Sequence, residues 1–298
     1  MIEDRAKQLR DLLAKPPVVC LGAHDPLSAL LAEEAGAKAL CLGGFAASAA
    51  YLGRPDLGLM SQTEVADHIR RVCNVVKIPV IADADNGYGG LFNVQRTVEL
   101  WEAAGAAALH IEDQVFPKRC GHMPGKEVVP VEEMVTKLEA AQRARRNPAF
   151  LLIARTDALA VSGLDDAIAR CRRYAEAGAD ALFVDAPESV EHLQRIGQEL
   201  KFLRKPLVFN AARTMKSPIV KVSELSSLGF SVVLYPIEGL FTAHKAMAQT
   251  YKTLLAEGST DAIADRMTSF VDFNKFLGLA DYFEQERNIV KRQVQSSR

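Results

Sequence analysis

Cysteine pairs, an excess of one charge and long apolar runs are all missing from this sequence. The five cysteines are scattered and never spaced as CxxC, which excludes a disulfide framework and a zinc site. Lysine and arginine (36) nearly balance aspartate and glutamate (37), which argues against a nucleic-acid surface. No apolar run approaches membrane-spanning length, and residues 1–15 are too charged for a signal peptide. We therefore expect a cytoplasmic protein that binds neither membranes nor nucleic acid.

Glycine-rich phosphate motifs are also missing, since neither GxGxxG nor GxxxxGK[ST] follows the first expected strand. Short apolar runs instead alternate with amphipathic segments along the chain. We expect eight strands, at residues 17–23, 38–44, 79–83, 106–111, 150–155, 180–184, 206–210 and 231–235. Continuously apolar strands joined by helices predict a parallel sheet covered on both faces. Eight such units predict an α/β protein with a closed (β/α)8 TIM barrel.

Helix boundaries can be predicted from local signals. The runs EEAGAKAL, EAAGAAAL and AEAGADAL each place a glycine between a helix and the next strand, where a left-handed glycine ends the helix. Ser61 can cap a helix that begins at Thr63, and the Gly/Ala/Ser-rich residues before it are expected to form a loop.

An aromatic tail follows the predicted barrel. We assign residues 1–257 to the catalytic barrel domain and 258–298 to a C-terminal helical extension. The extension carries Phe270, Phe273, Phe276 and Phe283, an unusual number of aromatic residues for a helix beyond a complete barrel. We expect it to pack on another subunit, and capping of its own barrel is the alternative.

Polar residues follow most of the expected strands. In chain order they are Cys41, Gly43 and Gly44, then Asp83 and Asp85, Glu112 and Asp113, Arg155, Asp185, Asn210 and Tyr235. Active sites of such barrels are built at the C-terminal ends of the strands. The sequence therefore predicts one site at this end of the barrel.

Three of these carboxylates suit a hard metal ion. Asp83, Asp85 and Glu112 are hard oxygen ligands at adjacent strand ends, and Mg²⁺ takes one or two carboxylates directly and keeps several waters. Mn²⁺ is the alternative metal. Asp83 and Asp85 could instead form an Asx-rich turn. Asp56, in RPDLG, fits either a turn residue or an outer partner of the metal site.

Cys120 lies in the most unusual stretch of the chain, HIEDQVFPKRCGHMPGK. Lys118, Arg119 and His122 surround it, and cationic neighbours lower the pKa of a thiol and make it available for proton transfer. We expect a catalytic cysteine here, with a buried structural thiol as the alternative.

Arg155 ends the apolar run LLIAR, where a guanidinium at a barrel mouth needs an anion. The anion is either a substrate carboxylate or developing oxyanion, or a structural partner such as Asp185 or Glu112. Asn210 favours neither a structural nor a binding role by itself, and we read His110 as a core histidine.

These residues carry a family resemblance. KRCGH at Lys118–His122, with DADNGYG, HIEDQ and ARTDA, resembles the isocitrate lyase and phosphoenolpyruvate mutase superfamily. It is most similar to the branch of 2-methylisocitrate lyase and 2,3-dimethylmalate lyase. The resemblance implies Mg²⁺-dependent retro-aldol cleavage of a small 2-hydroxy di- or tricarboxylate to an α-keto acid, such as pyruvate, and a carboxylic acid. It also implies exchange of the C-terminal helix in a homotetramer.

The resemblance implies a role for each residue of the motif. Cys120 protonates the departing acid as general acid, while Lys118, Arg119 and His122 tune the thiol and grip the second carboxylate. The remaining substrate-binding residues are Gly43, Gly44, Gly121, Arg155, Asp185 and Asn210. Some oxaloacetate hydrolases and a phosphonomutase share KRCGH, so hydrolysis or decarboxylation of oxaloacetate and phosphonate rearrangement stay open. A non-catalytic dicarboxylate binder is the distant alternative.

Several departures from the family pattern bear on the substrate. Family lyases commonly carry glutamate where this chain has Asp185. Ala212 and Arg213 replace a polar residue and an acid, so we expect Arg213 to add positive charge beside the distal carboxylate. Cys41 stands where methylisocitrate lyases have a tyrosine, and Phe45 where they have a glycine. These changes predict an acyl half other than that of methylisocitrate.

Overall fold

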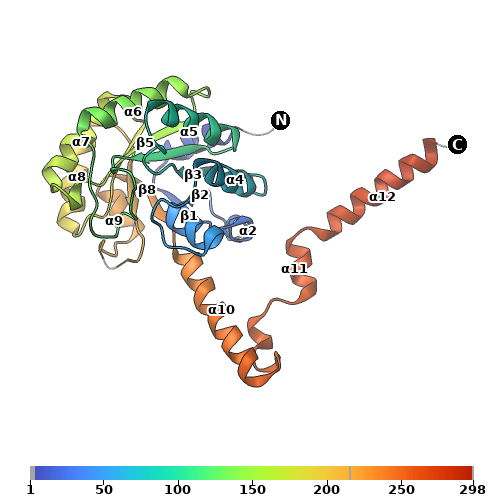
Figure 1. The fold of residues 1–298 in the computed structure, drawn as a ribbon. Helices are drawn as coiled ribbons and strands as arrows, with labels where there is room; N and C mark the ends of the chain where they lie inside the picture. The colour runs from blue at the N-terminus through green and yellow to red at the C-terminus, as the bar shows by residue number, and fades with distance from the viewer. Residues whose placement is uncertain (1–3, 215, 297–298) are drawn as a thin grey trace. The chain divides into compact units, whose positions relative to one another are not determined.

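The computed structural model describes residues 4–214 and 216–296. The chain divides into two compact units, Met1–Thr242 and Ala243–Arg298. The first unit contains a closed barrel of parallel strands in which every strand pairs with the next and β8 pairs with β1 (Figure 1). The strands are β1 Val18–Gly22, β2 Ala39–Leu42, β3 Val80–Asp83, β4 Ala108–Glu112, β5 Leu151–Thr156, β6 Ala181–Val184, β7 Leu207–Asn210 and β8 Phe230–Tyr235. The predicted TIM barrel and its eight strands are confirmed.

Helices cover the outside of this barrel (Figure 1). They are α2 Pro26–Glu34, α4 Gln62–Cys73, α5 Leu91–Ala103, α6 Val131–Ala144, α7 Leu164–Glu176, α8 Val190–Leu200 and α9 Val222–Ser227, with short 3₁₀ turns η2 Ala158–Ala160 and η3 Lys201–Leu203. Ser61 and Glu64 form a capping box at the start of α4. The predicted glycine stops are confirmed, because Gly36, Gly105 and Gly178 have φ of +92°, +91° and +97°.

The stretch after β2 is helical, and our expectation of a loop there is wrong. Gly44–Ala47 forms α3, and Ser48–Leu52 continues as a π-helical turn, η1, that ends at Gly53 with a φ of +62°. The alanines of this stretch have high helix propensity, and that preference outweighs its glycines and serine. Helix α3 therefore begins directly at the barrel mouth.

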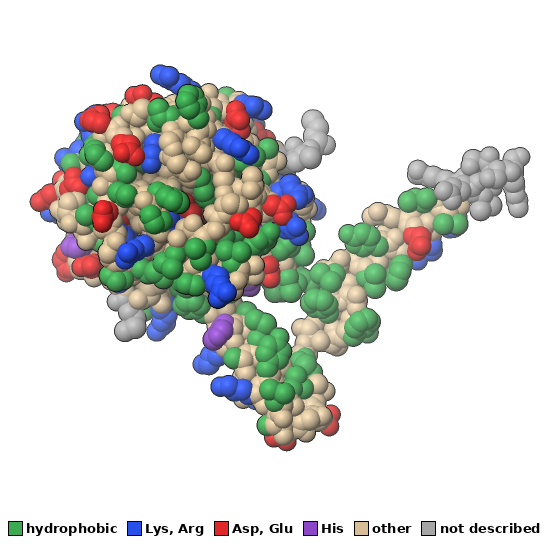
Figure 2. All heavy atoms as spheres, viewed as in Figure 1, with side chains coloured by type: hydrophobic (Ala, Val, Ile, Leu, Met, Phe, Trp, Pro, Cys, Tyr) green, Lys and Arg blue, Asp and Glu red, His purple; other side chains and the backbone are tan. Residues whose placement is uncertain are grey.

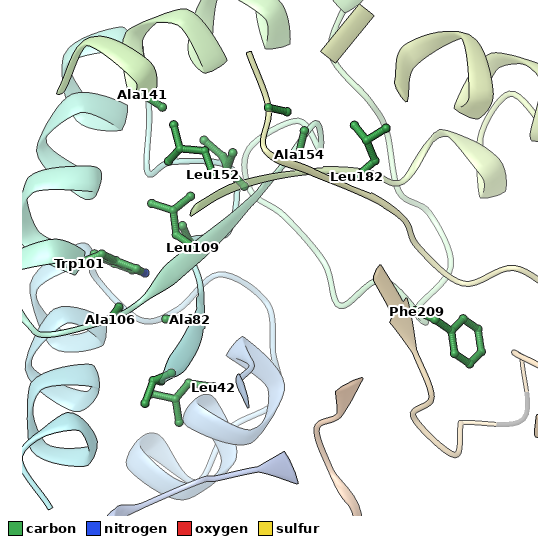
Figure 3. Close-up of a cluster of buried hydrophobic side chains, with 14 of the residues drawn as sticks. Leu42, Ala82, Trp101, Ala106, Leu109, Ala141, Leu152, Ala154, Leu182 and Phe209 are labelled. Carbon is green, nitrogen blue, oxygen red and sulfur yellow. The ribbon is translucent and has the colours of Figure 1, made fainter. Parts of the chain in front are cut away.

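The core has two layers because successive residues of each strand face opposite sides. Leu42, Ala82 and Leu109 point outward to the helices, where Trp101 of α5 is fully buried among them (Figure 3). The inward residues fill the barrel, and they include Cys41, Ile81, Ile153, Phe183, Val208 and Val232. Leu9 of the N-terminal helix α1, Arg5–Leu13, packs with this inner cluster and is fully buried. The first helix therefore closes one end of the barrel, which leaves the other for a site.

The second unit is entirely helical in its described part, which confirms the helical tail. It contains the later turns of α10, Glu238–Glu257, followed by a 3₁₀ turn η4 at Asp261–Arg266, α11 Phe270–Phe276 and α12 Leu279–Ser296. Hydrophobic side chains lie along these helices (Figure 2). In the part of the chain that the structure describes, no helix is long and apolar enough to cross a membrane.

One close approach between α8 and α9 gives a test of the barrel's packing. A Cβ atom at Gly197 would lie 1.9 Å from the carbonyl oxygen of Leu228. We expect Gly197→Ala to destabilise the protein by about 1–3 kcal/mol, because two backbones would have to move apart. The free energy of unfolding in urea measures this.

Gly239→Ala is the matched control. Its Cβ would meet Gly22 at an ordinary contact distance of 3.7 Å, and it lies in a helix, where alanine is favoured. We expect it to be neutral or slightly stabilising. Equal destabilisation by both changes would show that the close approach at Gly197 does not control stability.

Candidate active site

Strand register brings the predicted residues to one cavity at the C-terminal ends of the strands. Asp83 pairs with His110, and Glu112 pairs with Arg155. Of the residues predicted from sequence, the cavity lining includes Gly43, Gly44, Asp56, Asp83, Glu112, Lys118, Arg119, Cys120, Gly121, His122, Arg155 and Asn210. A smaller adjoining cavity is lined by Asp85 together with Asp56 and Asp83.

Asp83 and Asp85 form an Asx turn that is also part of the site. The Asp83 Oδ1 accepts from the backbone N–H of Asp85 at 3.0 Å, and Asp85 has a φ of +46°, which aspartate tolerates. The amide of Gly44 donates to Asp83 Oδ2 at 2.9 Å. In this structure the amide orients Asp83, and its predicted contact with substrate stays a prediction.

Lys118 is buried between two of the carboxylates. Its Nζ lies 2.7 Å from both Asp56 Oδ1 and Asp85 Oδ1. Asp56 is thus a partner of Lys118, and the ammonium is directed toward these carboxylates. Among the described residues, no group of three His, Cys, Asp or Glu is already arranged to hold a metal ion, and the convergence of Asp83, Asp85 and Glu112 on one metal stays a prediction.

Burial gives the carboxylates different pKa values. Burial alone would raise the pKa of Asp83, but the nearby charges of His110 and Lys118 outweigh it and lower this pKa to about 2. Burial raises the pKa of Asp85 to about 6 against the opposing charge of Lys118. It also raises the pKa of Glu112, whose Oε1 is buried without a hydrogen-bond partner.

Arg155 is held by carboxylates on three strand ends. Its Nε lies 3.2 Å from Glu112 Oε2 and 2.9 Å from Asp157 Oδ2, and its Nη2 lies 3.2 Å from Asp185 Oδ2. The structural ion pairs considered as an alternative are therefore present, although Arg155 also lines the cavity. Asp185 is fully buried, lies outside the lining and holds Arg155, and its predicted contact with substrate stays a prediction.

Gly121 is the point where the cysteine segment touches this ion-pair cluster. A Cβ atom there would lie 1.9 Å from Asp185 Oδ2 and 2.3 Å from Arg155 Nη2. Only glycine lets the backbone approach so closely. This packing places Cys120 beside the cluster.

The thiol of Cys120 is protonated at neutral pH, and our expectation of a lowered pKa is wrong. Burial raises the pKa of Cys120 to about 11, and Arg155 opposes this only in part. The adjacent cations do not lower this pKa, because both have other partners. Lys118 is bound to Asp56 and Asp85, and Arg119 donates to the Pro124 carbonyl at 3.1 Å. A protonated thiol suits a general acid rather than a nucleophile.

His122 is held in one tautomer by two neighbours. The amide oxygen of Asn210 accepts from the N–H of Ala212 at 3.1 Å, so its Nδ2 donates to His122 Nε2 at 3.3 Å. The His122 Nδ1 then carries the proton and donates to Thr214 Oγ1 at 2.6 Å. Burial lowers the pKa of His122, which favours the neutral ring.

Arg213 lies in the segment after β7, next to the cavity. Ala212 and Thr214 line the cavity, whereas Arg213 between them is exposed and lies outside the lining. Its expected charge beside the distal carboxylate stays a prediction. Thr214 was missed, because a lone threonine gives no signal until the fold places it beside His122.

One wall of the cavity is apolar. Phe45, Met123, Ile237 and Phe241 line it, and the rings of Phe45 and Phe241 meet edge to face with centroids 6.0 Å apart. Sequence reasoning noted only Phe45. The other three lie in helices or loops, and the sequence does not predict which of their side chains face the cavity.

The pKa of Cys120 can be tested by alkylation. Iodoacetamide should modify Cys120 in the native protein, because Cys20, Cys41, Cys73 and Cys171 are buried. Only the thiolate reacts, so the rate should rise about tenfold per pH unit between about pH 7 and pH 9. Peptide mass spectrometry measures this, and a rate that levels off near neutral pH would show that the pKa is lowered instead.

The sequence and the fold both match known proteins. Residues 9–255 match the family described as phosphoenolpyruvate phosphomutase. The chain is 40% identical to 2,3-dimethylmalate lyase of Eubacterium barkeri (95% of this chain, 97% of the relative). It is 39% identical to 2-methylisocitrate lyase of Escherichia coli (96% of each). It is 42% identical to the chloroplastic carboxyvinyl-carboxyphosphonate phosphorylmutase of Arabidopsis thaliana (90% of this chain, 80% of the relative).

Two solved structures share the whole fold. Oxaloacetate acetylhydrolase with the inhibitor 3,3-difluorooxalacetate superposes with a TM-score of 0.90, at 34% identity over 96% of this chain and 97% of that one. Phosphonopyruvate hydrolase with oxalate and Mg²⁺ superposes with a TM-score of 0.85, at 29% identity over 97% of this chain and 99% of that one. The family match, the sequence relatives and the fold all indicate one superfamily. The chain belongs to the phosphoenolpyruvate mutase and isocitrate lyase superfamily of enzymes.

Proposed function

We propose that this protein is a Mg²⁺-dependent carbon–carbon lyase. Its reaction is the retro-aldol cleavage of a 2-hydroxy dicarboxylate to an α-keto acid, such as pyruvate, and a second carboxylic acid. The observation that carries the proposal is a protonated thiol, Cys120, on the same cavity as Glu112 and Arg155. Cleavage leaves a carbanion on the departing acid, and a proton donor is what that intermediate needs.

The carboxylates fit a magnesium ion with few direct protein ligands. Glu112 Oε1 is a buried oxygen without a partner, and Asp83 lines the same cavity. Mg²⁺ is usually held through one or two carboxylates and several waters, so three converging ligands are not required. Asp83 and Glu112 would hold it directly or through water, with Asp85 and Asp56 behind them. The bound ion supplies Lewis-acid polarisation of the substrate oxygens.

The chain's own residues account for binding and proton transfer. Arg155 presents a fixed positive charge to the cavity, and it is oriented by Glu112, Asp157 and Asp185. A charge held in place before the reaction can stabilise a developing oxyanion without reorganisation. As the carbon–carbon bond breaks, the 2-hydroxyl of the substrate gives its proton to a carboxylate of the cavity and becomes the keto oxygen. Cys120 gives its own proton to the α-carbon of the departing acid, where the electron pair of the broken bond forms the new carbon–hydrogen bond.

The apolar wall supports a substrate with a hydrocarbon substituent. Phe45, Ile237 and Phe241 offer no partner to a third carboxylate, and burying an unpaired carboxylate there is costly. We therefore propose an alkyl-substituted malate over a tricarboxylate. This agrees in type with the dimethylmalate named for one relative. Exchange of the C-terminal helix in a homotetramer remains our prediction, and light scattering can test the tetramer.

Turnover with a panel of acids tests the reaction class. Purified protein with Mg²⁺ should cleave 2,3-dimethylmalate, to pyruvate and a matching acid, faster than it cleaves 2-methylisocitrate to pyruvate or isocitrate to glyoxylate. Cys120→Ser should lower kcat by about 10²–10⁴-fold with little change in KM, because proton delivery is lost and binding is kept. Mass spectrometry of the products measures both results.

Removal and return of the metal is the control. EDTA should abolish turnover, and added Mg²⁺ or Mn²⁺ should restore it. Loss of oxaloacetate, or rearrangement of a phosphonate, without cleavage of any hydroxy acid would contradict the lyase. Full activity of Cys120→Ser would contradict the role of the thiol.

A further inference from the structure

The segment that carries Cys120 is closed at its base and held separately at its tip. We call residues 113–130, between β4 and α6, the Cys120 loop. Its two ends pair as a short antiparallel ladder. In this ladder the Val115 N–H donates to the backbone carbonyl of Glu127 at 2.9 Å, and the Val129 N–H donates to the backbone carbonyl of Asp113 at 2.8 Å. This ladder does not reach Cys120, so other groups must fix the peptide units beside the thiol.

Gln114 fixes the residue before the thiol. Its side chain is almost fully buried, its Oε1 accepts from Arg119 N–H at 3.0 Å, and its Nε2 donates to the Arg119 carbonyl at 2.9 Å. Both ends of one amide therefore serve a single backbone residue. A hydrophobic side chain of the same size could fill the space but could not set the orientation of that backbone.

Lys126 fixes the residue after the thiol. Its Nζ donates to the Gly121 carbonyl at 2.5 Å and to Asp157 Oδ1 at 2.6 Å, and its side chain is 2% exposed. A buried ammonium is stable only with such partners. Asp157 follows β5 and also accepts from Arg155 at 2.9 and 3.1 Å. Lys126 therefore ties the tip of the loop to the strand end that carries Arg155.

Asp157 is itself held from behind. Its N–H donates to Asp113 Oδ1 at 2.9 Å, and Asp113 Oδ2 accepts from Tyr174 and from Thr156, both at 2.7 Å. Asp113 is the second acid of the HIEDQ motif and Asp157 the one acid of ARTDA, and neither was predicted from sequence to be a site residue. The buried network gives Lys126 a rigid attachment point.

We propose that Gln114 and Lys126 are positioning residues that hold the backbone of Arg119 and Gly121, the two residues flanking Cys120, against the barrel mouth. The proposal rests on the proposed function, in which the thiol must reach one carbon atom. Neither residue is among the described residues that line the cavity, so neither contacts substrate. Their loss should leave binding nearly intact and misplace the proton donor.

The test compares Lys126→Met with Lys137→Met. Lys137 on α6 is also buried, and its Nζ lies 3.4 Å from the Asn86 carbonyl and 3.5 Å from Glu133. It is the control for loss of a buried lysine, because neither of these two partners belongs to the Cys120 loop. Lys126→Arg keeps the charge, and Gln114→Met removes the second anchor independently.

Two readouts are measured on the full-length protein. Without substrate, Lys126→Met and Gln114→Met should speed iodoacetamide labelling of Cys120 by about 10-fold or more, because lost buried hydrogen bonds let the loop open. With substrate, kcat should fall by about 10²-fold while KM changes little, since a small misplacement is costly. Lys126→Arg should recover part of both effects, and Lys137→Met should match wild type.

The outcomes separate this proposal from the proposed function. Equal labelling of Cys120 in wild type, Lys126→Met and Gln114→Met would overturn the positioning role, as would equal effects of Lys126→Met and Lys137→Met. A change in KM alone would also overturn it. If wild type cleaves none of the acids, the proposed function fails, and the labelling rates still decide whether the two residues position the loop.

Discussion

The buried ion-pair cluster around Arg155 is the interaction on which the site depends. One guanidinium at the end of β5 contacts Glu112 of β4, Asp185 after β6 and Asp157 of its own strand end. Removing any one charge would leave others buried and unpaired, which is expensive in a protein interior. The cluster thereby fixes three neighbouring strand ends relative to one another. It also provides the surface on which Gly121 packs.

The same cluster connects the barrel to the thiol. Asp157 binds Arg155 on one side and Lys126 on the other, and Lys126 holds the Gly121 carbonyl next to Cys120. A catalytic group carried on a loop gains precision when rigid elements hold that loop. In the proposed reaction, the site therefore combines strand ends, which supply charge, with one anchored loop, which supplies the proton.

The fold was predictable because its signals are local. Apolar runs separated by glycine-stopped helices predict the strands from β1 to β8, and the rule that barrel sites lie at strand ends identifies Asp83, Glu112 and Arg155. Contacts between distant residues were not predictable in the same way. The pKa of Cys120 was predicted in the wrong direction, because sequence neighbours suggest nearby positive charge, whereas the fold directs Lys118 to Asp56 and buries the thiol. Thr214 and Lys126 matter only through partners about 90 and 30 residues away.

The central claim is that Cys120 delivers a solvent-derived proton to the carbon released by cleavage. It is tested most directly by running the reaction in D₂O and examining the carboxylic acid product by NMR. The account predicts a single deuteron at the α-carbon, in one stereochemical position, and its loss together with turnover in Cys120→Ser. Product formed without deuterium, or with deuterium in both positions equally, would contradict a positioned thiol as the proton donor.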